Sequence, residues 1–123
     1  MSKKIPENHI KLKRAYEPPA SDDGTRILID RLWPRGVRKA DAAIDEWTKE
    51  IAPSTELRKW FGHDPERWPE FQQRYKLEIR QHPEQLDRLR ALARHGRITL
   101  VFSAHDEAHN DAMVLKDLLL GRS

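Results

Sequence analysis

A charged stretch with a large aromatic side chain follows a short apolar run in the first third of the chain. The run over residues 27–29 leads at once into Asp30, Arg31, Trp33 and Arg35. Guanidinium groups are planar and permanently charged, so they suit a phosphate or a carboxylate. A tryptophan can stack on a base or a sugar, and an aspartate can accept hydrogen bonds or act as a general base. The stretch therefore indicates a site for an anionic ligand.

A second polar stretch follows another apolar run, from Ser103 to Asp106 and on to Asn110. If the two runs are neighbouring parallel strands, their carboxyl ends share one edge of the sheet, where open α/β sheets bind ligands. Helix N-termini near Ser54 and Ala108 add N–H groups that favour an anion. We therefore predict that a small phosphate-bearing or other anionic ligand binds at this edge. The predicted ligand-binding residues are Arg31, Trp33, Arg35, Ser54, Arg58 and Asn110.

The sequence leaves open whether the protein is an enzyme, because no activated nucleophile can be identified. Asp30 and Asp106 are the candidate general bases. The segment HDEAH, from His105 to His109, resembles the zinc motif H-E-x-x-H, but an aspartate stands in the place of the glutamate. His105 follows a strand directly and need not face His109, and no third ligand is evident. We therefore predict neither a metal site nor a cofactor.

Two other interpretations use the same residues. In the first, the basic segments 3–14 and 26–39 bind nucleic acid, although a net charge of +3 is a small excess for that role. In the second, Asp30 pairs with Arg31 or Arg58 and Trp33 closes the sheet, so that these residues stabilise a non-catalytic interaction protein. Nucleic acid is the less favoured partner, and the oligomeric state stays open.

The composition fits a single domain without covalent cross-links. The chain has 123 residues and no cysteine, so disulfides and thiolate metal sites are excluded. No segment has the ~20 apolar residues that a membrane helix needs, and no apolar run follows the N-terminal lysines. We therefore expect a cytoplasmic protein without a membrane partner. We expect a flexible basic arm over residues 1–9 and one domain over residues 10–121.

Hydrophobic periodicity predicts the elements that must position these residues. Apolar or alternating runs predict strands over residues 9–16, 25–30 and 97–104. Caps and apolar spacings predict helices over residues 41–47, 54–61, 64–79, 83–95 and 108–120. The predicted fold class is α/β, a small single-domain three-layer fold with a short, mainly parallel sheet flanked by helices. The direction of the first strand stays open, because the loop after it holds no helix.

Three segments carry a resemblance to a known family. GTRILIDRLWPRGVRK, DEWTKEIAPSTELRKWF and TLVFSAHDEAHNDAMVLKDLL resemble the YeaO-like branch of the bacterial domain-of-unknown-function family 488, over about residues 10–120. The resemblance implies the signature positions Asp30, Arg31, Trp33, Pro34, Arg35, Gly36, Pro53, Ser54, Leu57, Arg58 and Asn110. Relatives usually carry lysine in the place of His105, which implies that an anion site here lacks one cation. The resemblance implies no particular reaction.

Overall fold

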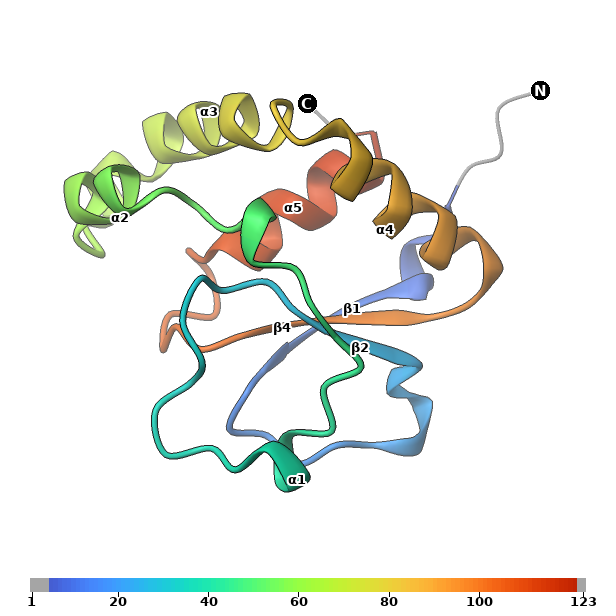
Figure 1. Cartoon of the computed structure of the whole chain (residues 1–123). Helices are drawn as coiled ribbons and strands as arrows, with labels where there is room; N and C mark the ends of the chain where they lie inside the picture. The colour runs from blue at the N-terminus through green and yellow to red at the C-terminus, as the bar shows by residue number, and fades with distance from the viewer. Residues whose placement is uncertain (1–4, 122–123) are drawn as a thin grey trace.

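A computed structural model describes residues 5–121 of the chain. Four strands form one parallel sheet in the order β1-β4-β2-β3 (Figure 1). The strands are β1 (Ile10–Arg14), β2 (Thr25–Leu28), β3 (Glu46–Trp47) and β4 (Ile98–Phe102). β1 pairs in parallel with β4, which gives the direction that the sequence left open. Because every strand runs the same way, their carboxyl ends lie at one edge of the sheet.

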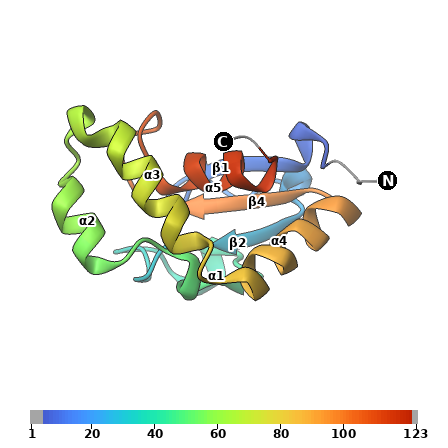
Figure 2. The ribbon, with the colours of Figure 1, turned by 90° about the horizontal axis from the view of Figure 1, so that it is seen from above.

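Helices cover the two faces of this sheet unequally. One face carries α2 (Thr55–Phe61), α3 (Trp68–Ile79), α4 (Pro83–His95) and α5 (Asp111–Leu119), and the other carries α1 (Lys39–Ala42) with its loops (Figure 1 and Figure 2). Short 3-10 turns span Glu7–His9, Ser21–Asp23, Lys49–Ile51 and Pro65–Arg67. None of the helices formed by residues 5–121 has the length and apolar character needed to cross a membrane. The architecture confirms the predicted α/β class.

The main core lies between the sheet and the four longer helices. Ile98, Leu100 and Phe102 alternate along β4 and turn to this face, where they pack with fully buried side chains of the helices such as Tyr75 and Leu115. A period of two along the strand and of three to four along the helices brings these side chains together. The core therefore fixes α5 and α3 over the sheet and positions the first residue of α5 near its carboxyl edge.

A smaller cluster lies on the opposite face. Val101 of β4, Leu28 of β2 and Ala15 are buried there, and Trp33 and Trp47 pack against them. The two tryptophan rings meet edge to face, with centroids 5.6 Å apart. This cluster closes the face of the sheet that the longer helices leave uncovered.

The segment after α1 differs from its sequence prediction. The helix predicted over residues 41–47 is wrong, because α1 ends at Ala42 and Glu46–Trp47 form β3. Ala43 takes a left-handed conformation with a φ of 50°, which ends the helix. Asp45 then bonds to the backbone of Arg26: its Oδ2 accepts from the amide at 2.8 Å, and its N–H donates to the carbonyl at 2.9 Å. These tertiary contacts outweigh local helix propensity.

The buried carboxylate of Asp23 forms hydrogen bonds with three basic side chains of the sheet. Lys11, Thr99 and Arg26 form one row across β1, β4 and β2, and Asp23 lies against this row. The Asp23 carboxylate bonds to Lys11 at 2.7 Å, to Lys13 at 3.2 Å and to Arg26 at 2.6 Å. Burial alone would raise the pKa of Asp23, but hydrogen bonds from the three cations and a backbone N–H hold this pKa well below its usual value. Three cations of the basic segments are thus paired inside the chain.

The first described residues lie against the domain. Ile5 packs on the main core, and His9 Nδ1 lies 2.6 Å from the carbonyl oxygen of Ala93. Residues 1–4 of the predicted arm lie outside the described residues. The contacts of Ile5 and His9 hold the described end of the arm against β1 and α4.

Candidate functional site

The carboxyl ends of β2 and β4 are joined by a direct contact between Asp30 and Ser103. Asp30 Oδ2 accepts hydrogen bonds from the Ser103 amide at 2.8 Å and from the Ser103 hydroxyl at 2.7 Å. The loops that follow the two strands lie on the same side of the molecule, at the left of Figure 1. The two polar stretches of the sequence therefore meet at one edge of the sheet, as the parallel pairing requires.

A second carboxyl group, that of Asp111, faces Asp30 from the first turn of α5. Asp111 Oδ1 accepts a hydrogen bond from the Ala112 amide at 3.0 Å. Burial raises the pKa of Asp111 well above its usual value, and the Asp30 carboxylate raises it further, while Arg58 opposes the shift. The raised pKa favours the protonated form of the Asp111 carboxyl.

The phenol of Tyr75 is a further buried polar group whose electrostatics these acids influence. Tyr75 is fully buried in α3, and its hydroxyl donates to the carbonyl oxygen of Ile51 at 2.7 Å. Burial raises the pKa of Tyr75 well above its usual value, and the charges of Asp111, Asp30 and Glu78 add to this effect. The phenol therefore stays neutral.

Two exposed arginines stand at the rim of the same edge. Arg31 follows Asp30, and its Nη2 lies 3.5 Å from the carbonyl oxygen of Pro53, just before α2. Arg58 is exposed on the first turns of α2, and its charge acts on Asp111. Neither guanidinium forms a salt bridge with an acid among residues 5–121. Both charges are therefore accessible to solvent beside the acid pair.

Arg35 and Trp33 occupy the loop on the other side of the edge. Arg35 is exposed, and its backbone carbonyl accepts from the Tyr16 hydroxyl at 3.2 Å. Trp33 Nε1 donates to the Val37 carbonyl at 2.7 Å, while its ring packs on Trp47. Trp33 therefore closes the small cluster below the sheet, as the structural interpretation of this residue proposed.

Ser54 caps α2 and ties it to α3. Its hydroxyl oxygen accepts from the Leu57 amide at 3.1 Å, and the hydroxyl donates to Glu78 Oε2 at 2.6 Å. The Ser54 amide donates to the other Glu78 oxygen at 2.8 Å. The cap confirms the predicted start of α2, and it uses the hydrogen-bonding groups that we had assigned to a ligand.

Asn110 and Asp106 organise the loop before α5. Asn110 is buried, accepts from the Met113 amide at 3.1 Å and donates to the Asp106 carbonyl at 3.0 Å. Asp106 Oδ1 accepts from the amides of Ala108 at 2.8 Å and His109 at 3.0 Å. The N–H groups near Ala108 that the sequence suggested for an anion are therefore bonded to a carboxylate of the chain itself.

The two histidines of the HDEAH segment have different partners. His109 Nδ1 lies 2.9 Å from Asp106 Oδ2, and this contact is the main cause that lowers the pKa of Asp106. His105 Nδ1 lies 3.1 Å from Arg14 Nη2 instead. Across residues 5–121, no three histidine, cysteine, aspartate or glutamate side chains gather in a way that could hold a metal ion. The segment thus shows an Asp–His pair and no shared histidine site.

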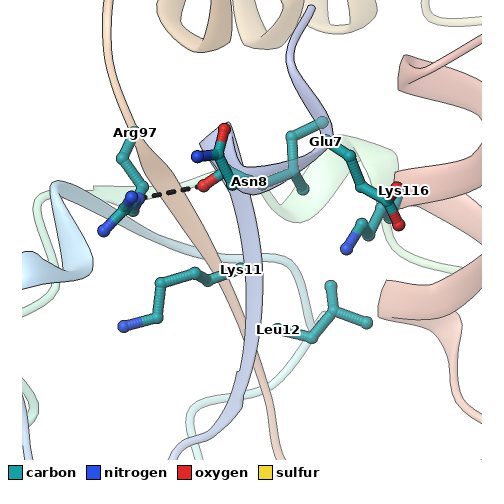
Figure 3. A pocket seen from close by; sticks show the side chains of 7 residues that line it. Glu7, Asn8, Lys11, Leu12, Arg97 and Lys116 are labelled. Carbon is teal, nitrogen blue, oxygen red and sulfur yellow. Dashed lines mark hydrogen bonds between the residues drawn. The ribbon is translucent and has the colours of Figure 1, made fainter.

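A separate hollow of about 500 Å³ lies at the other end of β1, among residues before and along that strand (Figure 3). Lys11, Arg97 and Lys116 contribute cations to its lining. Two of these cations are already engaged, because Lys11 and Arg97 both pair with Asp22 and Arg97 Nε donates to the Asn8 carbonyl at 2.9 Å. The carboxyl edge, with its accessible arginines, is the better candidate for an anion.

The chain matches a family model over most of its length. The model, described as the inactive DUF488-N3 subclade, covers residues 9–123. This chain belongs to that DUF488 family. The match confirms the resemblance that the signature segments carry.

The relatives of this DUF488 protein span nearly its whole length. Uncharacterised protein YeaO of Escherichia coli strain K12 is 47% identical over 111 residues, which are 90% of this chain and 96% of that protein. Uncharacterised protein Rv3073c of Mycobacterium tuberculosis strain H37Rv is 42% identical over 118 residues, 96% of this chain and 99% of that protein. No solved structure matches this chain.

Sequence analysis missed two acids that shape the site of this DUF488 protein. Asp111 follows the helix cap Asn110, a position where an aspartate is ordinary because it complements the helix dipole. Glu78 lies among the alternating acidic and basic residues of α3, a pattern that is typical of a solvent-exposed helix face. Only the tertiary contacts with Asp30 and Ser54 distinguish these acids from surface residues.

Proposed function

We propose that this DUF488 protein is a cytoplasmic domain that binds a small phosphate-bearing or otherwise anionic ligand at the carboxyl edge of its sheet. One observation carries the proposal. Arg31 and Arg58 are exposed, come from different elements and stand beside the Asp30–Asp111 pair without an acidic salt-bridge partner among residues 5–121. Guanidinium groups placed in this way are suited to a phosphate or a carboxylate.

The acids beside the arginines narrow the kind of ligand that fits. Asp30 uses Oδ2 for Ser103, and the acid pair can accept further hydrogen bonds from hydroxyl or amine groups. A ligand that joins an anionic group to hydroxyl groups, as a sugar phosphate or a nucleotide does, would match both parts of the edge. Arg35 would border such a ligand from the side of β1.

The family description favours binding over catalysis. The matching model is described as an inactive subclade. Asp30 is bound by Ser103 and Asp106 by His109, so both candidate bases already have partners. We therefore assign no reaction to the site.

The nucleic-acid alternative has less support. Lys11, Lys13 and Arg26 were part of its basic face, and all three bond to Asp23. Cations neutralised in this way contribute little to a phosphate backbone, which is bound through many accessible charges. Lys3 and Lys4 lie outside the described residues.

A thermal-shift titration with inorganic phosphate, sugar phosphates, mononucleotides and short oligonucleotides tests the proposal. A ligand that binds only the native state raises the apparent melting temperature with its concentration. We expect Arg58→Ala to abolish the shift produced by the small anion. Arg94→Ala is the matched control, because Arg94 is an exposed arginine at the end of α4, beside the amino end of β4.

The outcomes separate the three interpretations. A shift that Arg58→Ala removes and Arg94→Ala keeps supports the small-anion site. A shift produced by oligonucleotides alone, falling steeply with added salt, supports nucleic-acid binding instead. If Arg58→Ala lowers the melting temperature and no compound in the panel shifts the wild type, the arginine serves the fold and the proposal is wrong.

A further inference from the structure

We propose that the outer edge of β1 binds an extended acidic segment of another protein, which joins the four-stranded sheet as a further strand. Two features of the molecule carry this inference. One is the unpaired backbone edge of β1, and the other is a hollow with basic side chains that lies along the start of this strand. The inference concerns the amino end of β1 and does not depend on the anion site proposed at the carboxyl edge.

β1 is the outermost strand at one side of the sheet. It pairs with β4, and no other strand of residues 5–121 pairs with it. The N–H of Ala15 donates to the Phe102 carbonyl at 2.7 Å, and successive residues of a strand point their backbone groups to opposite sides. The N–H and C=O groups of Leu12 and the N–H of Arg14 therefore point away from β4. These groups are available to pair with an added strand.

The hollow provides space beside this edge. It has a volume of about 500 Å³, and its lining comes from the turn before β1, from β1 itself, from Arg97 just before β4 and from Lys116 of α5 (Figure 3). A paired strand lies about 4.8 Å from its neighbour, so an added strand would occupy the space directly alongside β1. Leu12 is half-buried and packs on the main core, so it offers an apolar contact on the helical face of the edge.

Basic side chains flank β1 on both faces of the sheet. Lys11 and Arg97 lie on one side of the strand, and Lys116 lies on the other (Figure 3). The lining holds these three cations and one acid, Glu7. The exposed carboxylate of Asp22 is shared between Lys11, at 3.2 Å, and Arg97, at 3.7 Å, so the cations outnumber the acids even when Asp22 is included. This excess of positive charge favours acidic side chains on the occupant.

The two faces of the edge define the pattern of the segment that fits. Side chains of an added strand alternate between the two faces of the sheet. Those on one face meet Lys11 and Arg97, and those on the other meet Leu12 and Lys116. The edge therefore fits an extended segment in which acidic residues alternate with apolar ones.

A second copy of this chain is a poor occupant of the edge. Its own β1 has the sequence IKLKR, so pairing of two β1 strands would set Lys11 and Lys13 against basic side chains of the other copy. Like charges directly opposite one another destabilise a strand pair, and lysines on edge strands commonly prevent pairing between copies. An acidic partner turns this repulsion into attraction.

A short peptide of alternating glutamate and valine is the probe for this edge. Fluorescence anisotropy of the labelled peptide measures its binding to the full chain, and the backbone ¹⁵N signals of Leu12 and Arg14 report where it lies. We expect both signals to shift, and both amide hydrogens to exchange more slowly with solvent in the complex. The same peptide with a methyl group on every backbone nitrogen keeps its charges but cannot donate to β1, so we expect it not to bind.

Charge reversal at the hollow tests the selection for acids. Lys116→Glu should weaken binding of the glutamate peptide by about tenfold or more, because it replaces an attraction with a repulsion. Lys59→Glu is the matched control, since Lys59 is an exposed lysine of α2 that does not line the hollow, and it should bind like the wild type. A peptide of alternating lysine and valine should not bind the wild type, and this comparison stays decisive even if Lys116→Glu is unstable.

The other outcomes overturn the proposal in different ways. Equal binding of the methylated peptide would show a contact through charge without strand pairing, and equal binding of the lysine peptide would remove the selection for acids. If the Leu12 and Arg14 signals shift with protein concentration alone, a second copy covers the edge and the proposed partner is wrong. Absence of binding by the glutamate peptide overturns the proposal outright. None of these measurements involves Arg58, so the anion site is tested separately.

Discussion

Arg26 and Asp23 form an ion pair in the interior of the sheet, with Arg26 Nη1 2.6 Å from Asp23 Oδ2. Their exposed fractions are 3% and 1%. Arg26 Nε donates to the Ala42 carbonyl at 3.0 Å, while Nη2 is buried without a hydrogen-bond partner among residues 5–121. The charge of Arg26 therefore depends on Asp23 for its compensation. The same carboxylate holds Lys11 and Lys13, so it joins β1 to β2 across β4.

Asp23→Asn should strongly destabilise the fold. The substitution leaves the buried Arg26 charge without its partner, and such a loss costs about 3–5 kcal/mol. Urea unfolding at neutral pH measures the change. Asp22→Asn is the matched control, because the side chain of Asp22 is 64% exposed and solvent screens its ion pairs. Equal losses in the two variants would contradict the role given to Asp23.

Acid should remove the same stabilisation in a defined range of pH. The pKa of Asp23 lies well below its usual value in the folded protein. Its contribution is therefore complete above the unfolded pKa, at about pH 4, and is lost as the pH falls from there towards the folded pKa. Unfolding free energies measured between about pH 2 and pH 5 should fall less steeply for Asp23→Asn than for the wild type. Parallel slopes would show that other carboxyls dominate the acid transition.

Gly24→Ala should cost more than an ordinary change at a positive φ. Gly24 has a φ of 65° and a ψ of −140°, and a Cβ there would lie 1.9 Å from the backbone oxygen of Arg97. The backbone must shift, so we expect a loss of at least about 2 kcal/mol. Gly36→Ala is the control, because Gly36 has a φ of 79° with no atom near the new Cβ, and it should lose about 1 kcal/mol. Thermal unfolding compares the two variants.

Most of the fold could be predicted because its signals are local. The apolar run of β4 and the Ser54 cap of α2 predicted their elements from neighbouring residues. β3 could not be predicted, since its two residues form a strand only through pairing with β2 and the contacts of Asp45 with Arg26. Elements defined by tertiary hydrogen bonds leave no periodic signal in the sequence.

The meeting of the two polar stretches could be predicted from the sequence, but the contacts of their side chains could not. Parallel pairing brought the Asp30 and Ser103 stretches to one edge because that is a property of the topology. The sequence could not show that Asp111 faces Asp30, because the two residues are far apart in the chain and only packing of α5 joins them. The partner of a polar side chain is a tertiary property, which residue type and spacing do not determine.

Ser54→Ala should weaken the junction of α2 and α3. The change removes the acceptor for the Leu57 amide and the donor to Glu78, so a helix cap and a contact with the next helix are lost together. A lost cap costs about 1–2 kcal/mol. Urea unfolding measures the loss, and Thr55→Ala is the control at the neighbouring exposed position. A loss no larger than that of Thr55→Ala would show that the cap contributes little.

Asp111→Asn should stabilise the protein at neutral and alkaline pH. Burial and the Asp30 carboxylate raise the pKa of Asp111 well above its usual value. The native state then binds the proton more tightly than the unfolded state, so stability falls as pH rises from about 4 through the folded pKa. An amide at this position cannot ionise and avoids this penalty, so the free energy of unfolding of Asp111→Asn should exceed that of the wild type near pH 8.

The pH profile of the unfolding free energy distinguishes this effect from a general change in packing. The gain of Asp111→Asn should be largest at high pH and should disappear well below about pH 4, where Asp111 is protonated in both the native and the unfolded state. Asp87→Asn, at an exposed position of α4, should follow the wild type throughout. A variant less stable than the wild type near pH 8 would mean that ionised Asp111 is compensated by Arg58. A variant more stable than the wild type near pH 8 would show that the Asp111 carboxyl lowers the stability of the fold, as polar residues at functional sites often do.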